Sequence, residues 1–124
     1  MKGIITAFAI MLFSMTAMAQ EQNAMVSTGE DFVIVKDEVV DGVRYVTATP
    51  CALVCLKHID IEFKDDIILK FVYSRGCDGN AKGIGALIKD MKVDEAIRRL
   101  EGIKCGKRPT SCPDQLARVL KALK

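Results

Sequence analysis

Two stretches near the start of the chain are rich in β-branched and aromatic residues, as β-strands are. They span residues 32–36 and 43–49, and Asp41-Gly42 lies between Val40 and Val43. This dipeptide favours the two-residue turn of a β-hairpin. Pro50 is expected to end the second strand, because proline cannot donate a backbone hydrogen bond. The pattern predicts a first hairpin that ends just before Cys51.

Apolar and polar side chains then alternate strictly. The apolar positions are Ile59, Ile61 and Phe63, and the polar positions are His58, Asp60 and Glu62. A period of two predicts a strand with one buried face. A polar turn at residues 64–66 leads into a second apolar strand at residues 67–73, which completes another hairpin. Cys55 precedes this hairpin and Cys77 follows it, so we expect both thiols at the same end of the sheet.

The second half of the chain carries apolar residues at helical spacing. The three stripes consist of Ile84, Leu87, Ile88 and Met91, then Val93, Ile97 and Leu100, then Leu116, Val119, Leu120 and Leu123. Spacings of three and four residues predict amphipathic helices, and Gly102 is expected to stop the second one. Strands followed by helices predict an α+β fold, in which a small antiparallel sheet of hairpins is covered on one face by about three helices.

The N-terminus has the pattern of an export signal. Lys2 precedes a short apolar run, and Ala17-Met18-Ala19 follows it as an A-x-A cleavage site. This predicts a signal peptide over residues 1–19, and a periplasmic or secreted protein with no stable membrane anchor after cleavage. The apolar run is too short for a transmembrane helix, which needs about 20 residues. We then expect an N-terminal extension with the first hairpin over residues 20–50 and a domain over residues 51–124.

Charge and composition argue against several functions. The net charge is +2, and the basic residues near the C-terminus lack interleaved aromatic side chains, so no nucleic-acid partner is expected. His58 is the only histidine, and its alternation with the apolar strand face predicts a solvated strand residue. The segment Gly79–Gly85 could form a phosphate-binding loop before a helix. It matches neither the P-loop nor the dinucleotide fingerprint, so turn and packing roles are favoured.

A cysteine stands at the expected start of the last helix. Ser111 and Asp114 form a capping pair, and Pro113 suits a first turn, where its missing N–H is not needed. Backbone N–H groups and the helix dipole would favour a thiolate at Cys112, and basic residues 107–108 lie just upstream. Cys112 is therefore the candidate reactive thiol. The alternative is a small apolar residue buried under the helix start.

The same segment carries a family resemblance. Residues 110–114 read TSCPD, residues 76–80 read GCDGN, residues 93–95 read VDE and residues 102–106 read GIKCG. Together with Cys55, these motifs resemble the TSCPD domain family over residues 55–124. The family is known from the C-terminal region of adenosylcobalamin-dependent ribonucleoside-diphosphate reductases and from short stand-alone proteins that carry the reductase label. The resemblance assigns no catalytic residue, and a barrel of about 250 residues does not fit in this chain.

Four of the five cysteines are expected to act together. They are the candidate metal ligands Cys55, Cys77, Cys105 and Cys112, and zinc or an iron–sulfur cluster would suit such thiolates. The layout also resembles that of U-type iron–sulfur cluster scaffolds, although the catalytic aspartate and terminal histidine of that family have no equivalents here. Two disulfides, for example 55–77 and 105–112, are the competing interpretation for an exported chain. Cys51 has no counterpart in the family pattern.

Three functional hypotheses follow. The first is a reductase-associated module without its own catalysis, whose cysteines bind metal or undergo redox change. The second is a thiol oxidoreductase that passes electrons from Cys112 to a protein partner. The third is an exported binding domain held together by disulfides. Bound metal and free thiols, measured after aerobic and anaerobic purification, separate the three.

Overall fold

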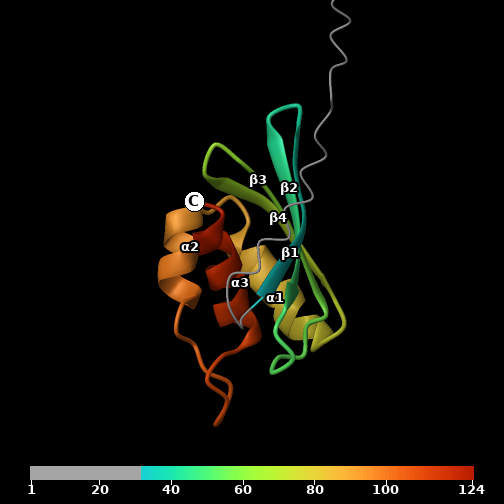
Figure 1. The fold of residues 1–124 in the computed structure, drawn as a ribbon. Helices are drawn as coiled ribbons and strands as arrows, with labels where there is room; N and C mark the ends of the chain where they lie inside the picture. The colour runs from blue at the N-terminus through green and yellow to red at the C-terminus, as the bar shows by residue number, and fades with distance from the viewer. Residues whose placement is uncertain (1–31) are drawn as a thin grey trace, which may run out of the picture.

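The computed structural model describes residues 32–124, which form one antiparallel sheet followed by three helices. The elements are β1 (Phe32–Val40), β2 (Val43–Pro50), β3 (His58–Lys64), β4 (Ile67–Ser74), α1 (Asp78–Ile88), α2 (Val93–Leu100) and α3 (Cys112–Ala122). The strands follow one another in the sheet in the order β1-β2-β3-β4. The predicted α+β layout is confirmed (Figure 1). The expected signal sequence over residues 1–19 lies outside the described residues.

Both hairpin turns have a backbone that few residues adopt. Asp41 and Gly42 have φ values of 52° and 79°, and Asp65 and Asp66 have φ values of 48° and 66°. Glycine and aspartate tolerate positive φ better than most residues, and the twist of such turns matches that of the flanking strands. The first hairpin is longer than the composition predicts, because β1 continues to Val40, which pairs with Val43 across the turn.

The core face of the sheet is built from aligned apolar pairs. Ile61 lies between Val46 on β2 and Phe71 on β4, and all three are buried. The alternation in β3 is confirmed, since Ile59 and Ile61 are buried while His58 and Asp60 are exposed. The apolar stripe of α3 completes this core, with Leu116, Val119 and Leu120 each fully buried.

The first helix uses a narrower face than its sequence suggests. Leu87 was expected in its buried stripe but is 76% exposed, and Met91 lies beyond the end of α1 at Ile88. Ala81 and Ile88 are the buried residues of this helix. The closest packing of α1 is against β4, with Phe71 O only 3.2 Å from where a Cβ on Gly85 would stand. A helix that packs mainly against one strand buries only a narrow stripe of its surface, and Leu87 lies outside that stripe.

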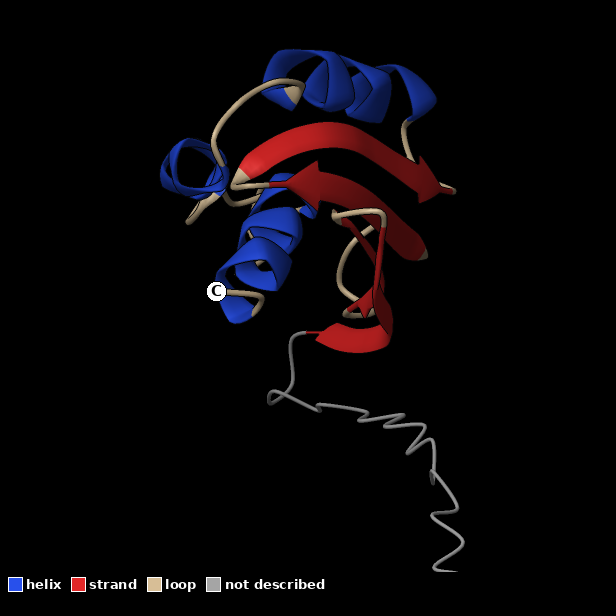
Figure 2. Ribbon diagram, turned by 90° about the horizontal axis from the view of Figure 1, so that it is seen from above, coloured by secondary structure: helices blue, strands red, loops and turns tan. Residues whose placement is uncertain are grey.

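The helices occupy different positions around the sheet. The last helix, α3, contacts β1 and β2 and packs extensively against α2, while α1 runs beside β4 (Figures 1 and 2). This arrangement brings the N-terminal ends of α1 and α3 to one region, next to the loop that joins β2 and β3. Among residues 32–124, no helix has the length and apolar character needed to cross a membrane.

Candidate functional site: a cavity lined by four cysteines

The helix α3 begins with the predicted cap. Ser111 has an extended backbone, and its hydroxyl accepts a hydrogen bond from the Asp114 N–H at 3.2 Å. Pro113 occupies the first turn, where no intrahelical partner for an N–H is required. The Ser111 hydroxyl also donates to the carbonyl of Ile103 at 2.6 Å, which holds the preceding loop against the helix start.

The carboxylate of Asp114 has more partners than a simple cap. Its side chain is 2% exposed and receives hydrogen bonds from Gly102 N–H at 2.7 Å and Thr110 Oγ1 at 2.6 Å. Arg118 Nε lies 2.9 Å from Oδ2. Burial raises the pKa of this carboxyl group, but the hydrogen bonds and Arg118 outweigh that effect and leave the pKa below its usual value. Asp114 is therefore a buried, fully partnered anion.

The neighbouring Gln115 extends this network to another part of the chain. Its side-chain amide donates to Thr110 Oγ1 at 3.1 Å and accepts a hydrogen bond from the Cys51 N–H, also at 3.1 Å. Sequence analysis missed both Thr110 and Gln115, although the available signal was a glutamine beside the apolar stripe of α3. The network ties the β2–β3 loop to the start of α3. Within the motif at 110–114, the first, second and fifth residues thus build the helix start.

The helix α1 begins without a side-chain cap. Cys77 occupies the N-cap position but its side chain makes no capping hydrogen bond. Tyr73 on β4 contacts the carbonyl groups at this helix start instead, since its hydroxyl lies 2.9 Å from the carbonyl oxygen of Cys77 and 2.7 Å from that of Asp78. Partial desolvation, together with the Asp78 charge, raises the pKa of Tyr73, so its hydroxyl remains a donor at neutral pH.

The turn before α1 requires glycine. Gly76 has a φ of +126°, and a Cβ placed there would stand 3.0 Å from Leu56 Cδ2 and 3.6 Å from the Cβ of Cys55. Gly76 therefore allows the β4–α1 turn and the β2–β3 loop to approach each other closely.

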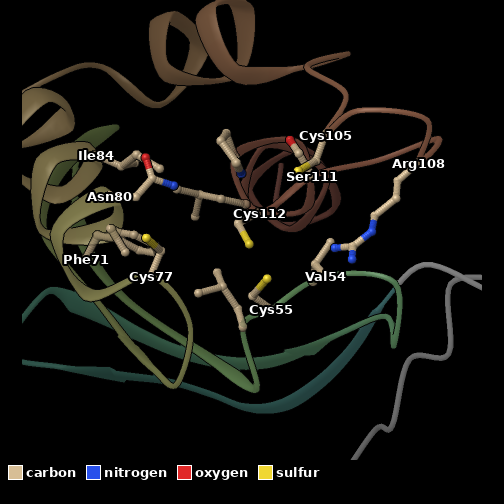
Figure 3. A pocket seen from close by; sticks show the side chains of 14 residues that line it. Val54, Cys55, Phe71, Cys77, Asn80, Ile84, Cys105, Arg108, Ser111 and Cys112 are labelled. Atoms are coloured by element: carbon tan, nitrogen blue, oxygen red, sulfur yellow. The ribbon is translucent and has the colours of Figure 1, made fainter.

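A cavity of about 160 Å³ lies between these two helix starts, and four cysteines line it. They are the four of the family pattern, Cys55, Cys77, Cys105 and Cys112, and Cys51 is not among the lining residues. Figure 3 shows the sulfur atoms of Cys55, Cys77 and Cys112 directed toward the cavity, with Cys105 and Arg108 along another side. The remaining wall is mostly apolar, from residues Val54, Leu56, Phe71, Ala81, Ile84, Pro113 and Leu116.

All five cysteines are free thiols in the structure. Cys55, Cys77 and Cys105 are exposed, whereas Cys112 is half-buried. The four thiols are suitable donors for zinc or an iron–sulfur cluster. Within residues 32–124, however, no three His, Cys, Asp or Glu side chains lie close enough together to hold a metal ion. As placed, the cysteines share a cavity without forming a coordination sphere.

Two other sequence expectations concern this region. His58 is exposed on the polar side of β3 and is not among the residues that line the cavity. Residues 79–85, for which turn and packing roles were favoured over a phosphate-binding loop, lie within α1. Gly85 has the packing role, since Phe71 O lies 3.2 Å from where a Cβ on Gly85 would stand.

Comparison with known proteins gives one match. The model of the TSCPD domain family matches residues 33–124. The matched range includes the β1–β2 hairpin, which the sequence assigned to an N-terminal extension, as well as the segment with the four cysteines. No curated protein and no solved structure matches the chain.

Proposed function

Because the chain belongs to the TSCPD domain family, which is found in ribonucleotide-reductase-associated proteins, we propose that it is a thiol-redox accessory module. The supporting observation is the cavity, where four free cysteines lie on the two helix starts and two loops around it. Thiol–disulfide exchange requires only accessible thiols that can approach one another. It does not require a large catalytic barrel.

Cys112 is the attacking thiol in this proposal. Its position at the N-terminal end of α3 places it at the positive end of the helix dipole, which favours a negative charge. The Cys112 thiolate attacks one sulfur of a partner's disulfide, forms a mixed disulfide and releases the other partner sulfur as a thiolate. A second thiolate of the module then attacks the Cys112 sulfur and releases the partner's second thiolate. Two electrons reach the partner, and the module ends as a disulfide.

Cys55 is the best second thiol. It lies on the β2–β3 loop, outside any helix or strand, is exposed and lines the cavity with Cys112 (Figure 3). The carbonyl of Cys77 accepts hydrogen bonds from the Tyr73 hydroxyl and from the Ala81 N–H, which hold its backbone. At Cys105, the N–H and C=O both take part in backbone hydrogen bonds of the 102–111 loop. Cys55 can therefore move toward Cys112 with the least disturbance.

Disulfide mapping tests this assignment. The reduced protein is treated with one equivalent of a small disulfide oxidant, quenched in acid, digested and analysed by mass spectrometry. We expect a peptide pair that joins Cys55 to Cys112, and we expect Cys55→Ser to accumulate the mixed disulfide on Cys112. Cys51→Ser is the matched control, since Cys51 does not line the cavity. A first disulfide between 55 and 77, or between 105 and 112, would contradict the proposed pair, and no reaction at Cys112 would contradict the function.

Metal binding is the second candidate, because four soft ligands surround one cavity. It would require the loops with Cys55 and Cys105 to move, since no three ligands are grouped as placed. Anaerobically purified protein, analysed for zinc, iron and free thiols, separates the two candidates. One zinc ion or one cluster per chain, lost together in Cys55→Ser and Cys112→Ser, would favour metal binding. Metal-free protein with five free thiols supports the redox proposal, and two stable disulfides would favour the exported binding domain.

We also propose that the module acts outside the cytoplasm, because residues 1–19 have the pattern of a cleavable signal. Cell fractionation with mass spectrometry of the N-terminus tests this. The expected mature chain begins at Gln20 and is found in the periplasm or the medium. An intact precursor that stays in the cytoplasm would contradict export and favour direct contact with a reductase.

A further inference from the structure

The loop between α2 and α3 carries three cations beside the cavity. Lys104, Lys107 and Arg108 are exposed, and none of them makes an ion pair with any residue in the part of the chain that the structure describes. There is no acidic residue between Gly102 and Pro113. The loop therefore presents an uncompensated positive charge.

One of these three cations, Arg108, lies at the cavity with the thiols. Arg108 lines the cavity together with Cys105 and Cys112, and it is the one charged residue in the lining (Figure 3). The acidic residue at the other helix start, Asp78, is paired with Lys82 at 2.7 Å. A group that enters the cavity consequently meets thiols, apolar side chains and positive charge.

The cavity itself is small. A volume of about 160 Å³ is close to that of an apolar protein cavity that accepts a molecule of benzene, and below the roughly 300 Å³ at which typical small-molecule pockets begin. It has room for one apolar side chain. A protein segment can place one side chain there while the rest of the segment lies over the basic loop.

We propose that the redox partner presents its disulfide on an acidic protein segment, with an apolar residue beside the reacting cysteine. The apolar side chain enters the cavity, and the partner's carboxylates face Lys104, Lys107 and Arg108. This inference rests on the proposed thiol exchange and adds the chemistry of the partner. Complementary charge raises the rate of encounter between partners, and salt suppresses the effect.

Activated peptides test the proposal. Three peptides carry the same Leu-Cys core, with the cysteine as a neutral 2-pyridyl disulfide, and differ only in flanking Glu, Gln or Lys residues. The rate of pyridinethione release is measured at low salt and near 1 M salt. We expect the Glu peptide to react roughly tenfold faster than the Lys peptide at low salt. The difference should disappear at high salt, where the Debye length is about 3 Å.

Charge reversal locates the effect. Lys104→Glu, Lys107→Glu and Arg108→Glu, combined in one variant, should reverse the preference between the Glu and Lys peptides. The matched control combines Lys64→Glu, Lys89→Glu and Lys92→Glu, which changes the net charge equally at exposed positions that do not line the cavity. The control should keep the preference for the Glu peptide.

The outcomes distinguish this inference from the proposed function. Equal rates for all three peptides, with the reaction lost in Cys112→Ser, would overturn the acidic partner and leave thiol exchange standing. A preference that survives charge reversal of the loop would also overturn it. If a small dicarboxylate disulfide reacts as fast as the Glu peptide, the protein segment is the wrong partner. If no peptide reacts through Cys112, the proposed function itself fails.

Discussion

The two helices that begin at the cavity are anchored in opposite ways. At the start of α3, Asp114 is buried and receives hydrogen bonds from a backbone N–H, a hydroxyl and an arginine. At the start of α1, the exposed carboxylate of Asp78 pairs, among residues 32–124, with Lys82 alone, one turn later. Both helix starts present a cysteine to the same cavity, but only the start of α3 is held by a buried hydrogen-bond network. This difference favours Cys112 as a fixed attacking thiol, while the chain around Cys55 and Cys77 is held by fewer side chains.

The largest expected effect is on the stability of the α3 start. Asp114→Ala removes a buried anion and leaves Gly102 N–H, Thr110 and Arg118 without this acceptor, so we expect a loss of about 3 kcal/mol in the free energy of unfolding. Urea denaturation measures it. The matched change at α1, Asp78→Ala, should have little measurable effect because it breaks only an exposed ion pair. Equal losses in both variants would remove the distinction between the two helix starts.

The contribution of Asp114 to the free energy of unfolding should depend on pH, and that of Asp78 much less. The pKa of Asp114 is lowered in the folded protein, so its stabilisation is present above the unfolded-state pKa of about 4 and is lost as the pH falls through the folded-state value. The difference in unfolding free energy between the wild type and Asp114→Asn should be largest at neutral pH and shrink below about pH 4. Asp78→Asn is the control. A difference that stays constant down to pH 2 would contradict the linkage.

The turn before α1 should be less sensitive than the α3 network, but still measurable. Gly76→Ala forces a positive φ on alanine and brings Cβ against Leu56, so we expect a loss of about 2 kcal/mol. Gly79→Ala, three residues later inside α1, has open space and a helical backbone and should raise stability slightly. Thermal unfolding of both variants measures the effect. A neutral Gly76→Ala would mean that the turn adjusts easily.

Thiol reactivity gives a third comparison. At neutral pH in reduced, metal-free protein, Cys112 should alkylate with iodoacetamide roughly two- to fivefold faster than Cys51, because Cys51 has no helix start behind it. Because Cys55, Cys77 and Cys105 are exposed and also alkylate, mass spectrometry follows the peptides with Cys112 and Cys51 separately. If Cys112 alkylates no faster than Cys51, it is better described as buried packing. A Cys112→Ser variant that fails to fold and loses bound metal would instead favour the metal site.

The smallest effect is expected at Tyr73. Tyr73→Phe removes the hydroxyl that contacts the carbonyls of Cys77 and Asp78. Cys77 and Asp78 are exposed, so water can take the place of this hydroxyl. We expect a loss of stability smaller than that of Gly76→Ala and faster hydrogen exchange confined to the first turn of α1. Exchange mass spectrometry measures this. Faster exchange in α3 as well would show that the two helix starts are coupled.

Much of the fold was predictable because local chemistry and periodicity agree. The Asp41-Gly42 turn, the alternation around Ile59 and Ile61 and the Ser111 cap each depend on neighbours close in sequence. The stripe assigned to α1 was wrong at Leu87, because the width of a buried face depends on what packs against the helix. The role of Gln115 also could not be predicted, because it depends on a tertiary contact with Cys51, which is 64 residues away.

The sequence by itself determined the order of the elements, the family motifs and the cap at Ser111, since these depend on side-chain type and short spacings. The hairpin and the family motifs led us to expect Cys55, Cys77, Cys105 and Cys112 together, but only the tertiary structure decided that they line one apolar cavity with Arg108 beside them. It also decided that Asp114 serves as a buried anchor beyond its role in a helix cap. The physical reason is that burial and convergence arise from the packing of α1, α3 and the β2–β3 loop, which are distant in sequence.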